Sequence, residues 1–449
     1  FVTSRPSRPT LPAPTEVLTT PATGAPRIAT SRQSVDGGVE VRLPLLGLGR
    51  PATPPPPDAV QPAPSPRRVP PPREAQSRYA DAPVTDSGRD LRFDALRGLC
   101  ALVMIIDHVG GASYLYGLTG GNSFVVSAAE GFIFLSGLMV GLIYGRRIVR
   151  DGIEVVQWRL LRRAATLYSL TLSLTFLFVG LSRFASMPWL QDDARLSTRL
   201  VVGILTLHRT YYLVDVLVLY TILMVLAPGA LLLMHRGGSR VVAALTIGVW
   251  AIYQVFPDEA AIPWTIVNND TFRFPAWQLW FFGGTLVGYH RQSISRTVSS
   301  VPRWLMVGVL GGLAFVTILV HVTNGEAIAR ALQAPSGNAV MNALFDKTAA
   351  RPGRIVAFAI WFPFLYLVLT AGWRVLTLAL GWILIPFGQN ALYVYAMHLF
   401  VVFLGALLLP YIPGFDRMNA VHNTPVQLAS VALIWVAVRL RMFFDIVPR

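Results

Sequence analysis

An arginine and a histidine in one apolar stretch have the types and the spacing that chemistry inside a membrane requires. Arg97 and His108 lie eleven positions apart. Over this interval an α-helix returns to within about 20° of the same face and rises roughly 16 Å. Ionisable groups in an apolar helix are costly and usually mark function. This face would suit an acyl-CoA, with its phosphates near Arg97 at the headgroup level and its thioester near His108 at mid-membrane depth.

His108 is the predicted catalytic base, and Asp107 beside it is the second predicted catalytic residue. An imidazole acts best as a general base when a carboxylate orients its other ring nitrogen. Neighbouring residues point about 100° apart on a helix, so Asp107 could instead serve another partner. The plainer alternative is that Arg97 extends its guanidinium to the membrane surface while His108 binds a buried carbonyl.

Glu130 is the third predicted catalytic residue. It lies in the second apolar stretch, where a carboxylate needs an arginine, a histidine or a polar cavity. We therefore expect Glu130 to face the site that contains His108. The glycines that follow it at intervals of four residues line one helix face, and close packing on a neighbouring backbone is their default interpretation: Gly137, Gly141 and Gly145.

Arg159 and Arg162 lie on adjacent turns of one helix face at the start of the third apolar stretch. Two guanidinium groups there could clamp a phosphate or a pyrophosphate, so the predicted donor-binding residues are Arg97, Arg159 and Arg162. Ordinary anchoring by positive charges explains the same pair equally well. The sequence has no Walker loop or dinucleotide fingerprint, so side chains rather than a glycine loop would hold the phosphate.

The sequence predicts no metal site and no permanently bound cofactor, so the acyl-CoA would be a donor substrate. The seven histidines include no pair at a helical metal spacing. Cys100 is the only cysteine, which excludes an intrachain disulfide and a cysteine metal site. Other polar residues at membrane depth are weaker candidates, because interhelical hydrogen bonds explain them equally well: Asp215, Tyr220, Trp277, Gln278, Asn390 and His398.

The elements that must carry these residues are membrane-spanning helices. The chain has 449 residues, of which 53% are hydrophobic and 14% charged, whereas about a quarter of the residues in soluble proteins are charged. A span needs roughly 20 apolar residues, and an open sheet edge cannot face lipid. The predicted fold is all-α and polytopic, with about ten transmembrane helices near residues 95–115, 124–145, 164–183, 211–234, 241–256, 274–290, 304–322, 355–373, 388–410 and 425–443. The stretch 199–209 is too short to cross.

Residues 1–90 are predicted to be a disordered, proline-rich cytoplasmic tail, and residues 91–449 the membrane domain. The formal net charge is +15, but the arginines lie mainly in alternate short loops, so we expect the lipid bilayer as a partner and not nucleic acid. This distribution places both termini in the cytoplasm. Lys347 is the only lysine among the 38 Lys and Arg residues, which indicates a codon bias and weakens any single arginine as a sign of bidentate binding.

The motifs together resemble the OpgC family, bacterial inner-membrane proteins that succinylate osmoregulated periplasmic glucans. Two motifs carry most of the likeness: RDLRFDALRG at 89–98, which leads into Asp107 and His108, and AEGFIFLSG at 129–137. Further support comes from DVLVLY at 215–220, AWQ at 276–278, Lys347 with Arg354, and GQNALYVY at 388–395 with His398. The likeness covers about residues 89–445.

The wider membrane acyltransferase-3 group, to which that family belongs, has an arginine eleven residues before a histidine in its first span and Arg-x-x-Arg in its third. Arg97 with His108 and Arg159 with Arg162 match these elements. The resemblance implies transfer of an acyl group, succinyl from succinyl-CoA, out of the cytoplasm to hydroxyls of a periplasmic glucan or other polysaccharide. His108 would act as the base or accept the acyl group first. Ala391 stands where the family often has serine, which bears on the glucan more than on the chemistry.

A transporter or flippase for a glycan or an acyl donor is the alternative function, since transport paths also contain buried charges. Such folds often show internal repeats with broken helices, and this sequence shows no convincing repeat. A non-catalytic scaffold would leave the alignment of Arg97 with His108 unexplained. The sequence leaves open the acyl group, the glucan and the oligomeric state.

Overall fold

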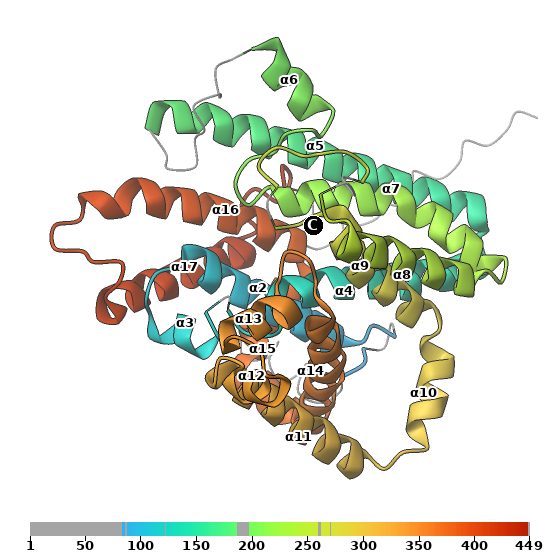
Figure 1. Cartoon of the computed structure of the whole chain (residues 1–449). Coiled ribbons are helices and arrows are strands. Elements are labelled where there is room, and N and C mark those ends of the chain that lie inside the picture. Colours follow the sequence, from blue (N-terminus) through green and yellow to red (C-terminus); the bar gives the residue numbers. More distant parts are fainter. Residues whose placement is uncertain are drawn as a thin grey trace, which may run out of the picture. The chain divides into compact units, whose positions relative to one another are not determined.

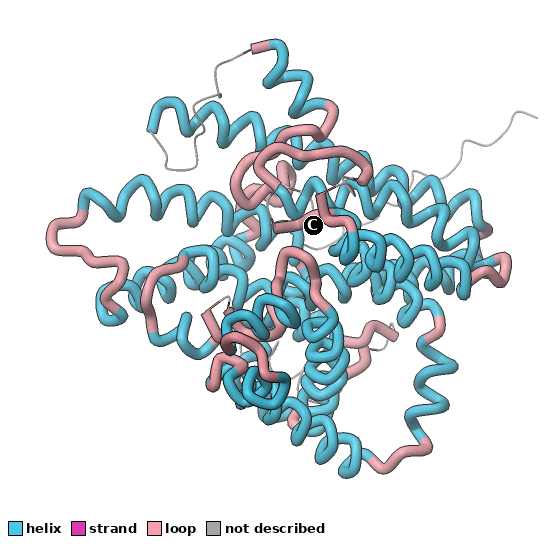
Figure 2. The backbone as a smooth tube through the Cα atoms, viewed as in Figure 1, coloured by secondary structure: helices cyan, strands magenta, loops and turns pink. Residues whose placement is uncertain are grey.

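The computed structural model describes residues 83–85, 88–121, 123–185, 197–258, 262–269 and 271–447. Helices joined by loops make up this part of the chain (Figure 2), and its strand pairings are isolated bridges only. The prediction of an all-α fold is confirmed. Most of the predicted tail, residues 1–82, lies outside the described residues.

A helix overlaps each of the predicted spans (Figure 1). The helices are α2 (Leu91–Val109), α3 (Tyr114–Leu118), α4 (Ala128–Asp151), α5 (Ile153–Ala185), α6 (Thr198–Leu205), α7 (Asp215–His235), α8 (Ser239–Val255), α9 (Phe274–Tyr289), α10 (Arg291–Ser299), α11 (Arg303–Val322), α12 (Glu326–Leu332), α13 (Gly337–Phe345), α14 (Pro352–Ala371), α15 (Trp373–Gln389), α16 (Ala391–Leu408) and α17 (Ala420–Leu440). Among the described residues, 7 helices are long and apolar enough to cross a membrane, namely α4, α5, α7, α11, α14, α16 and α17. The stretch predicted to be too short to cross forms the 8-residue helix α6.

Helix α15 corrects the prediction between the eighth and ninth spans, where we expected a loop at residues 374–387. Arg374, the first residue after the eighth predicted span, lies in the first turn of a 17-residue apolar helix, where a long cationic side chain is tolerated. Gly372 alone separates α14 from α15, and Asn390 alone separates α15 from α16. The long apolar run is thus divided into three helices instead of two.

Glycines hold α2 against α15. A Cβ on Gly98 would lie 1.8 Å from the carbonyl oxygen of Leu384, and a Cβ on Gly388 would lie 1.7 Å from that of Asp94. Any side chain at either glycine would overlap the facing backbone. The helix that the sequence did not predict is therefore a principal support of the helix that carries Arg97 and His108.

The glycine face of α4 packs on α9. A Cβ on Gly137 would lie 1.9 Å from the carbonyl oxygen of Phe281, and a Cβ on Gly141 would lie 2.1 Å from that of Thr285. Such backbone contact is what small residues allow between membrane helices. The packing interpretation of these glycines is confirmed.

The turn between α13 and α14 is tied to α8. Trp250 donates from its indole Nε1 to the Ala350 carbonyl oxygen at 2.9 Å, and Gln254 donates to the Ala349 carbonyl oxygen at 2.7 Å. These two bonds fix a segment without regular structure. The segment carries Lys347.

Candidate functional site

Helix α2 has a defined start and a defined end. The Asp90 carboxylate caps its first turn by accepting from the backbone N–H of Arg92 at 3.2 Å. Gly110 ends the helix with a φ of 64°, in the left-handed region that glycine adopts easily. Arg97 and His108 therefore lie on one unbroken helix, and the predicted separation of roughly 16 Å along its axis holds.

His108 meets a second histidine, from α16. Its Nδ1 lies 2.9 Å from Nε2 of His398, whose side chain is buried and whose Nδ1 is hydrogen-bonded to the Tyr395 carbonyl oxygen. A carbonyl oxygen only accepts, so the proton of His398 lies on Nδ1, and its Nε2 is an acceptor in the neutral ring. His108 must then donate from Nδ1, which leaves the lone pair of its Nε2 available as a base.

Tyr395 and His398 are themselves fixed by α16 and its surroundings. The Tyr395 hydroxyl donates to the Leu213 carbonyl oxygen, which ties this helix to the segment before α7. The rings of Tyr395 and His398 meet edge to face with centroids 4.7 Å apart. In the histidine pair, formed by His108 and His398, the ring of His398 is therefore held rigidly.

Of the two roles open to Asp107, orienting His108 or binding another partner, the structure shows the second. Its Oδ1 accepts from the Thr119 hydroxyl at 2.9 Å, and His398 occupies the orienting position on the imidazole. Adjacent side chains on a helix diverge by about 100°, so Asp107 and His108 reach different partners. Asp107 ties α2 to the end of α3, and a direct catalytic role for it stays a prediction.

Glu130 holds two elements together. Its Oε1 accepts from Nε of Arg354 at 2.5 Å, and its Oε2 accepts from the backbone N–H of Ser127 at 2.9 Å. Glu130 is 0% exposed and Arg354 is 3% exposed, so the ion pair is fully buried. Arg354 also donates to the Phe345 carbonyl oxygen at 3.0 Å. The contacts show an anchor between α4 and α14, and the predicted catalytic role of Glu130 stays a prediction.

We expect Glu130→Gln to lower the stability of the protein strongly, because it leaves the buried Arg354 guanidinium without its counter-charge. Breaking a buried pair from one side costs about 3–5 kcal/mol. Thermal unfolding in detergent measures the loss. Asp151→Asn is the control: it removes two pairs whose arginines are exposed, Arg150 by 74% and Arg159 by 43%, and it should change the midpoint little. Unchanged stability with abolished activity would instead support the catalytic assignment.

Lys347 joins the site from the turn between α13 and α14. It interacts electrostatically with Asp107, Glu130 and Asp215, with Arg354, and with His108. Burial lowers the pKa of the Lys347 ammonium below its usual 10.5, the nearby carboxylates oppose this, and Arg354 adds to it. Sequence reasoning took Lys347 as a sign of codon bias and, with Arg354, as part of the family resemblance, but gave it no role in the site. The presence of a single lysine in an arginine-rich chain was the sequence signal that could have identified Lys347 as a site residue.

Arg97 has no ion pair among the described residues. Its Nε is buried without a hydrogen-bond partner, and its Nη2 lies 3.5 Å from the Leu135 carbonyl oxygen, at the limit of a hydrogen bond. Asp94 is electrostatically close, but its two oxygens accept from Arg89 at 2.7 and 2.8 Å. A guanidinium held this way lacks the hydrogen bonds and the counter-charge that burial demands. The arrangement can take up an anion.

Two cations interact electrostatically with Arg97: Arg163 of α5, and Arg89, which is paired with Asp94. Arg159 is 43% exposed and pairs with Asp151, while Arg162 and Arg163 are exposed. Of the arginines on α5, Arg163 is therefore the one whose charge acts on Arg97, whereas Arg159 of the predicted clamp is paired with Asp151. The sequence shows three arginines within five positions, and tertiary packing decides which of them approaches α2. Binding of the donor by Arg159 and Arg162 stays a prediction.

The weaker candidates divide into two groups. Gln278 donates to the Thr246 carbonyl oxygen at 2.7 Å, Tyr220 donates to the Phe132 carbonyl oxygen at 3.0 Å, and Asn390 bonds within its own chain segment at 2.9 Å. The bonds of Gln278 and Tyr220 are the interhelical hydrogen bonds that we gave as the alternative, whereas the bond of Asn390 is local, to the Pro386 carbonyl oxygen one turn earlier. His398 forms the second group, because it contacts a predicted catalytic residue.

The long apolar helices and the buried polar residues on them define an all-helical membrane protein. A sequence model described as OpgC protein matches residues 89–445. The chain therefore belongs to the OpgC family. No curated protein and no solved structure matches the chain.

Proposed function

We propose that this protein is an acyltransferase that moves a succinyl group from cytoplasmic succinyl-CoA to a hydroxyl of a glucan on the periplasmic side of the bacterial inner membrane. The observation that carries the proposal is the hydrogen-bonded series from the Tyr395 carbonyl through His398 to His108, which leaves Nε2 of His108 as a base. The succinyl group, the glucan and the membrane rest on the family resemblance. Membership of the wider acyltransferase-3 group is part of the same proposal.

The reaction needs one proton acceptor and one leaving-group acid. Nε2 of His108 takes the proton of the sugar hydroxyl as the oxygen attacks the thioester carbonyl. The new C–O bond forms, the C–S bond breaks, and the proton passes from His108 to the thiolate of CoA. His398 stabilises the charged imidazole by accepting from its Nδ1–H. General base catalysis of this kind contributes about 10²–10⁴-fold.

The donor is held by cations at the other end of α2. Arg97 supplies a guanidinium that lacks a counter-ion, and Arg163 adds a second positive charge. Together they suit a phosphate of CoA, because charge-assisted hydrogen bonds from arginine are strong and often bidentate. The roughly 16 Å between Arg97 and His108 separates the phosphate end of the donor from its thioester.

Lys347 supplies the positive charge that the reaction needs at the developing oxyanion. Its ammonium interacts electrostatically with His108 and with the carboxylates of Asp107, Glu130 and Asp215.

The rate of transfer should therefore fall at alkaline pH, as the Lys347 ammonium loses its proton. Burial lowers the pKa of Lys347 below 10.5, so the fall should begin at a lower pH than for an exposed lysine. Lys347→Arg should retain activity to higher pH, because an arginine stays charged above pH 12. Lys347→Gln should be weakly active at every pH. Profiles of kcat against pH for the three proteins, corrected for thioester hydrolysis, measure this, and identical profiles would remove Lys347 from the mechanism.

Mass spectrometry of periplasmic glucans tests the function itself. A bacterial strain without its own glucan succinyltransferase is compared with the same strain expressing this chain. We expect glucans heavier by the mass of one or more succinyl esters, which mild alkali removes. Acetyl esters would change the acyl group in the proposal, and unmodified glucans would contradict it. Glucans that change in location but not in mass would favour the transporter alternative.

A further inference from the structure

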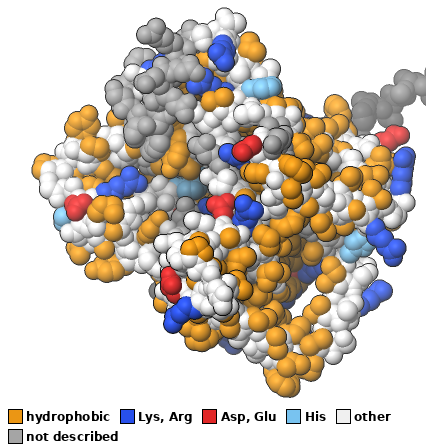
Figure 3. Space-filling view, viewed as in Figure 1, with side chains coloured by type: hydrophobic (Ala, Val, Ile, Leu, Met, Phe, Trp, Pro, Cys, Tyr) orange, Lys and Arg blue, Asp and Glu red, His pale blue; other side chains and the backbone are white. Residues whose placement is uncertain are grey.

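A large chamber lies between helices, and its lining does not include the histidine pair. It has a volume of about 1110 Å³ and is enclosed by α8, α9, α10, α11 and α14, with two residues of α4 and the start of α2 at its inner wall. Helix α10 arches from the end of α9 to the start of α11 (Figure 1). Figure 3 shows hydrophobic side chains bordering the hollow on this face.

The chamber must hold an apolar occupant. Its walls are mainly aromatic and aliphatic, and include Trp280, Phe358 and Phe362. Protein interiors have few voids larger than a water molecule, and water enters a cavity only where polar groups hold it. A space of this size in a bilayer therefore fills with hydrocarbon. Gly283 faces it directly, since a Cβ there would meet nothing within 4 Å.

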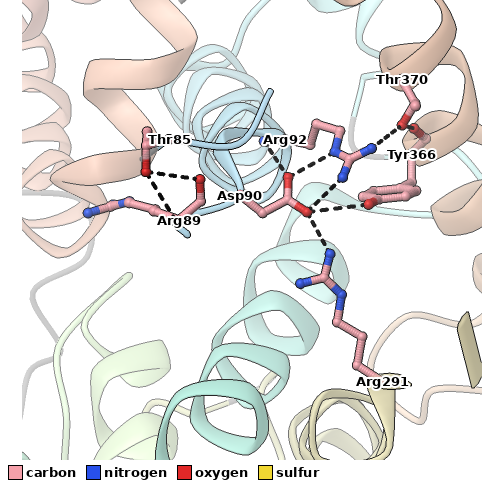
Figure 4. A network of polar contacts seen from close by, with 7 residues as sticks. All are labelled: Thr85, Arg89, Asp90, Arg92, Arg291, Tyr366 and Thr370. Carbon is pink, nitrogen blue, oxygen red and sulfur yellow. Dashed lines mark hydrogen bonds and ion pairs between the residues drawn. The ribbon is translucent and has the colours of Figure 1, made fainter. Parts of the chain in front are cut away.

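One end of the chamber is positively charged. Three arginines line it, Arg92, Arg291 and Arg303, which we call the arginine rim. Asp90 pairs with Arg92 at 2.8 Å and with Arg291 at 2.6 Å, and Figure 4 shows both guanidinium groups directed at this one carboxylate. Arg303 is exposed and has no ion pair among the described residues. The rim thus keeps two positive charges in excess.

The Asp90 network also ties the rim to the chamber wall. Arg92 donates to the Thr370 hydroxyl of α14 at 3.2 Å, and the Tyr366 hydroxyl lies 3.4 Å from the same Asp90 oxygen that Arg291 contacts. Burial would raise the pKa of Asp90, but the two arginines outweigh it and hold the pKa below its usual value. Asp90 stays ionised, and the geometry of the rim is fixed from three helices.

We infer that the chamber binds an anionic phospholipid, with its phosphate at the arginine rim and its acyl chains between α9, α11 and α14. Basic pockets between membrane helices recognise anionic headgroups in this way, each Lys or Arg contributing on the order of 1 kcal/mol. A phospholipid matches both features of the chamber: its acyl chains suit the apolar walls, and its phosphate suits the arginine rim. A helix of a second copy would fill the space but would leave the excess charge of the rim unmatched. The inference does not depend on the proposed function.

Native mass spectrometry of the full chain in detergent tests the inference. The protein is titrated with dioleoylphosphatidylglycerol and, separately, with zwitterionic dioleoylphosphatidylcholine, whose choline offsets the charge of its phosphate. We expect one phosphatidylglycerol to bind more tightly than phosphatidylcholine. Arg303→Gln should weaken phosphatidylglycerol about fivefold and phosphatidylcholine by a smaller factor. Gly283→Phe should weaken both lipids because its ring occupies the chamber, and Ala359→Phe provides a second wall variant.

Two control variants make the same kinds of substitution away from the chamber. Arg240→Gln removes an exposed arginine that does not line the chamber, and Gly312→Phe adds a ring on α11 where a Cβ also meets nothing within 4 Å. Both should bind lipid as the unaltered protein does. Equal binding of the two lipids, or lipid binding that neither the rim nor the wall variants change, would overturn the inference. A dimer that Gly283→Phe and Ala359→Phe dissociate would assign the chamber to a second copy.

Discussion

Replacing His108 with alanine should lower kcat for acyl transfer by about 10²–10⁴-fold, because it removes the general base. His398→Ala should also lower kcat, by a smaller factor. It leaves Nδ1 of His108 without its acceptor, so the imidazole is no longer held in the tautomer with a basic Nε2. The two residues are thus expected to act as a unit, and the double variant should be little worse than His108→Ala alone.

Glutamine variants separate the two roles. His398→Gln presents an amide oxygen that can accept from Nδ1 of His108, so it should recover part of the activity that His398→Ala loses. His108→Gln cannot act as a base and should recover nothing. Steady-state transfer with succinyl-CoA, with monodispersity checked by size-exclusion chromatography, measures these four single variants and the double variant. Equal loss in both His398 variants would mean that the residue acts through packing alone.

Arg97→Gln should raise KM for succinyl-CoA by about 10- to 100-fold, since a hydrogen bond to a charged group contributes about 1.5–3 kcal/mol. The same change should not lower stability and should raise it slightly. Arg97 is a guanidinium whose Nε lacks any hydrogen bond, so a neutral side chain relieves the cost of holding it there. A binding residue loses function and gains stability in this way, whereas a structural residue loses both.

The readouts for Arg97 are KM, kcat and the midpoint of thermal unfolding. Arg236→Gln, which removes an exposed arginine at the end of α7, is the matched control and should leave all three unchanged. A lower midpoint with unaltered KM in Arg97→Gln would assign Arg97 to the fold and remove it from the donor site.

The sequence predicted the features that local pattern determines. Apolar stretches located a helix for every predicted span, and the interval between Arg97 and His108 correctly implied one helix. The glycine face of α4 predicted close packing, which Gly137 and Gly141 show. Helix α15 was missed, because Arg374 follows the eighth predicted span with the charge expected of a loop although it lies in a helix. The shorter helices α10, α12 and α13 also lie outside the predicted spans.

Contacts between distant positions could not be predicted in this way. His398 is 290 residues from His108, and its polar side chain in an apolar helix was compatible with any interhelical partner. Arg354 is 224 residues from Glu130, so the anchor between α4 and α14 could not be identified either. Tertiary packing also decides that Arg163 approaches Arg97 and that Asp107 turns to Thr119. Each of these outcomes depends on how helices rotate against one another.

Transfer across a sealed bilayer tests the central claim most directly. The purified protein is placed in proteoliposomes, with isotopically labelled succinyl-CoA on one side and glucan on the other, and glucan esters are measured by mass spectrometry. We predict labelled succinyl esters on the glucan with the unaltered protein and none above background with His108→Ala. Labelled glucan at equal rates with both proteins, or passage of either substrate without ester formation, would contradict the account.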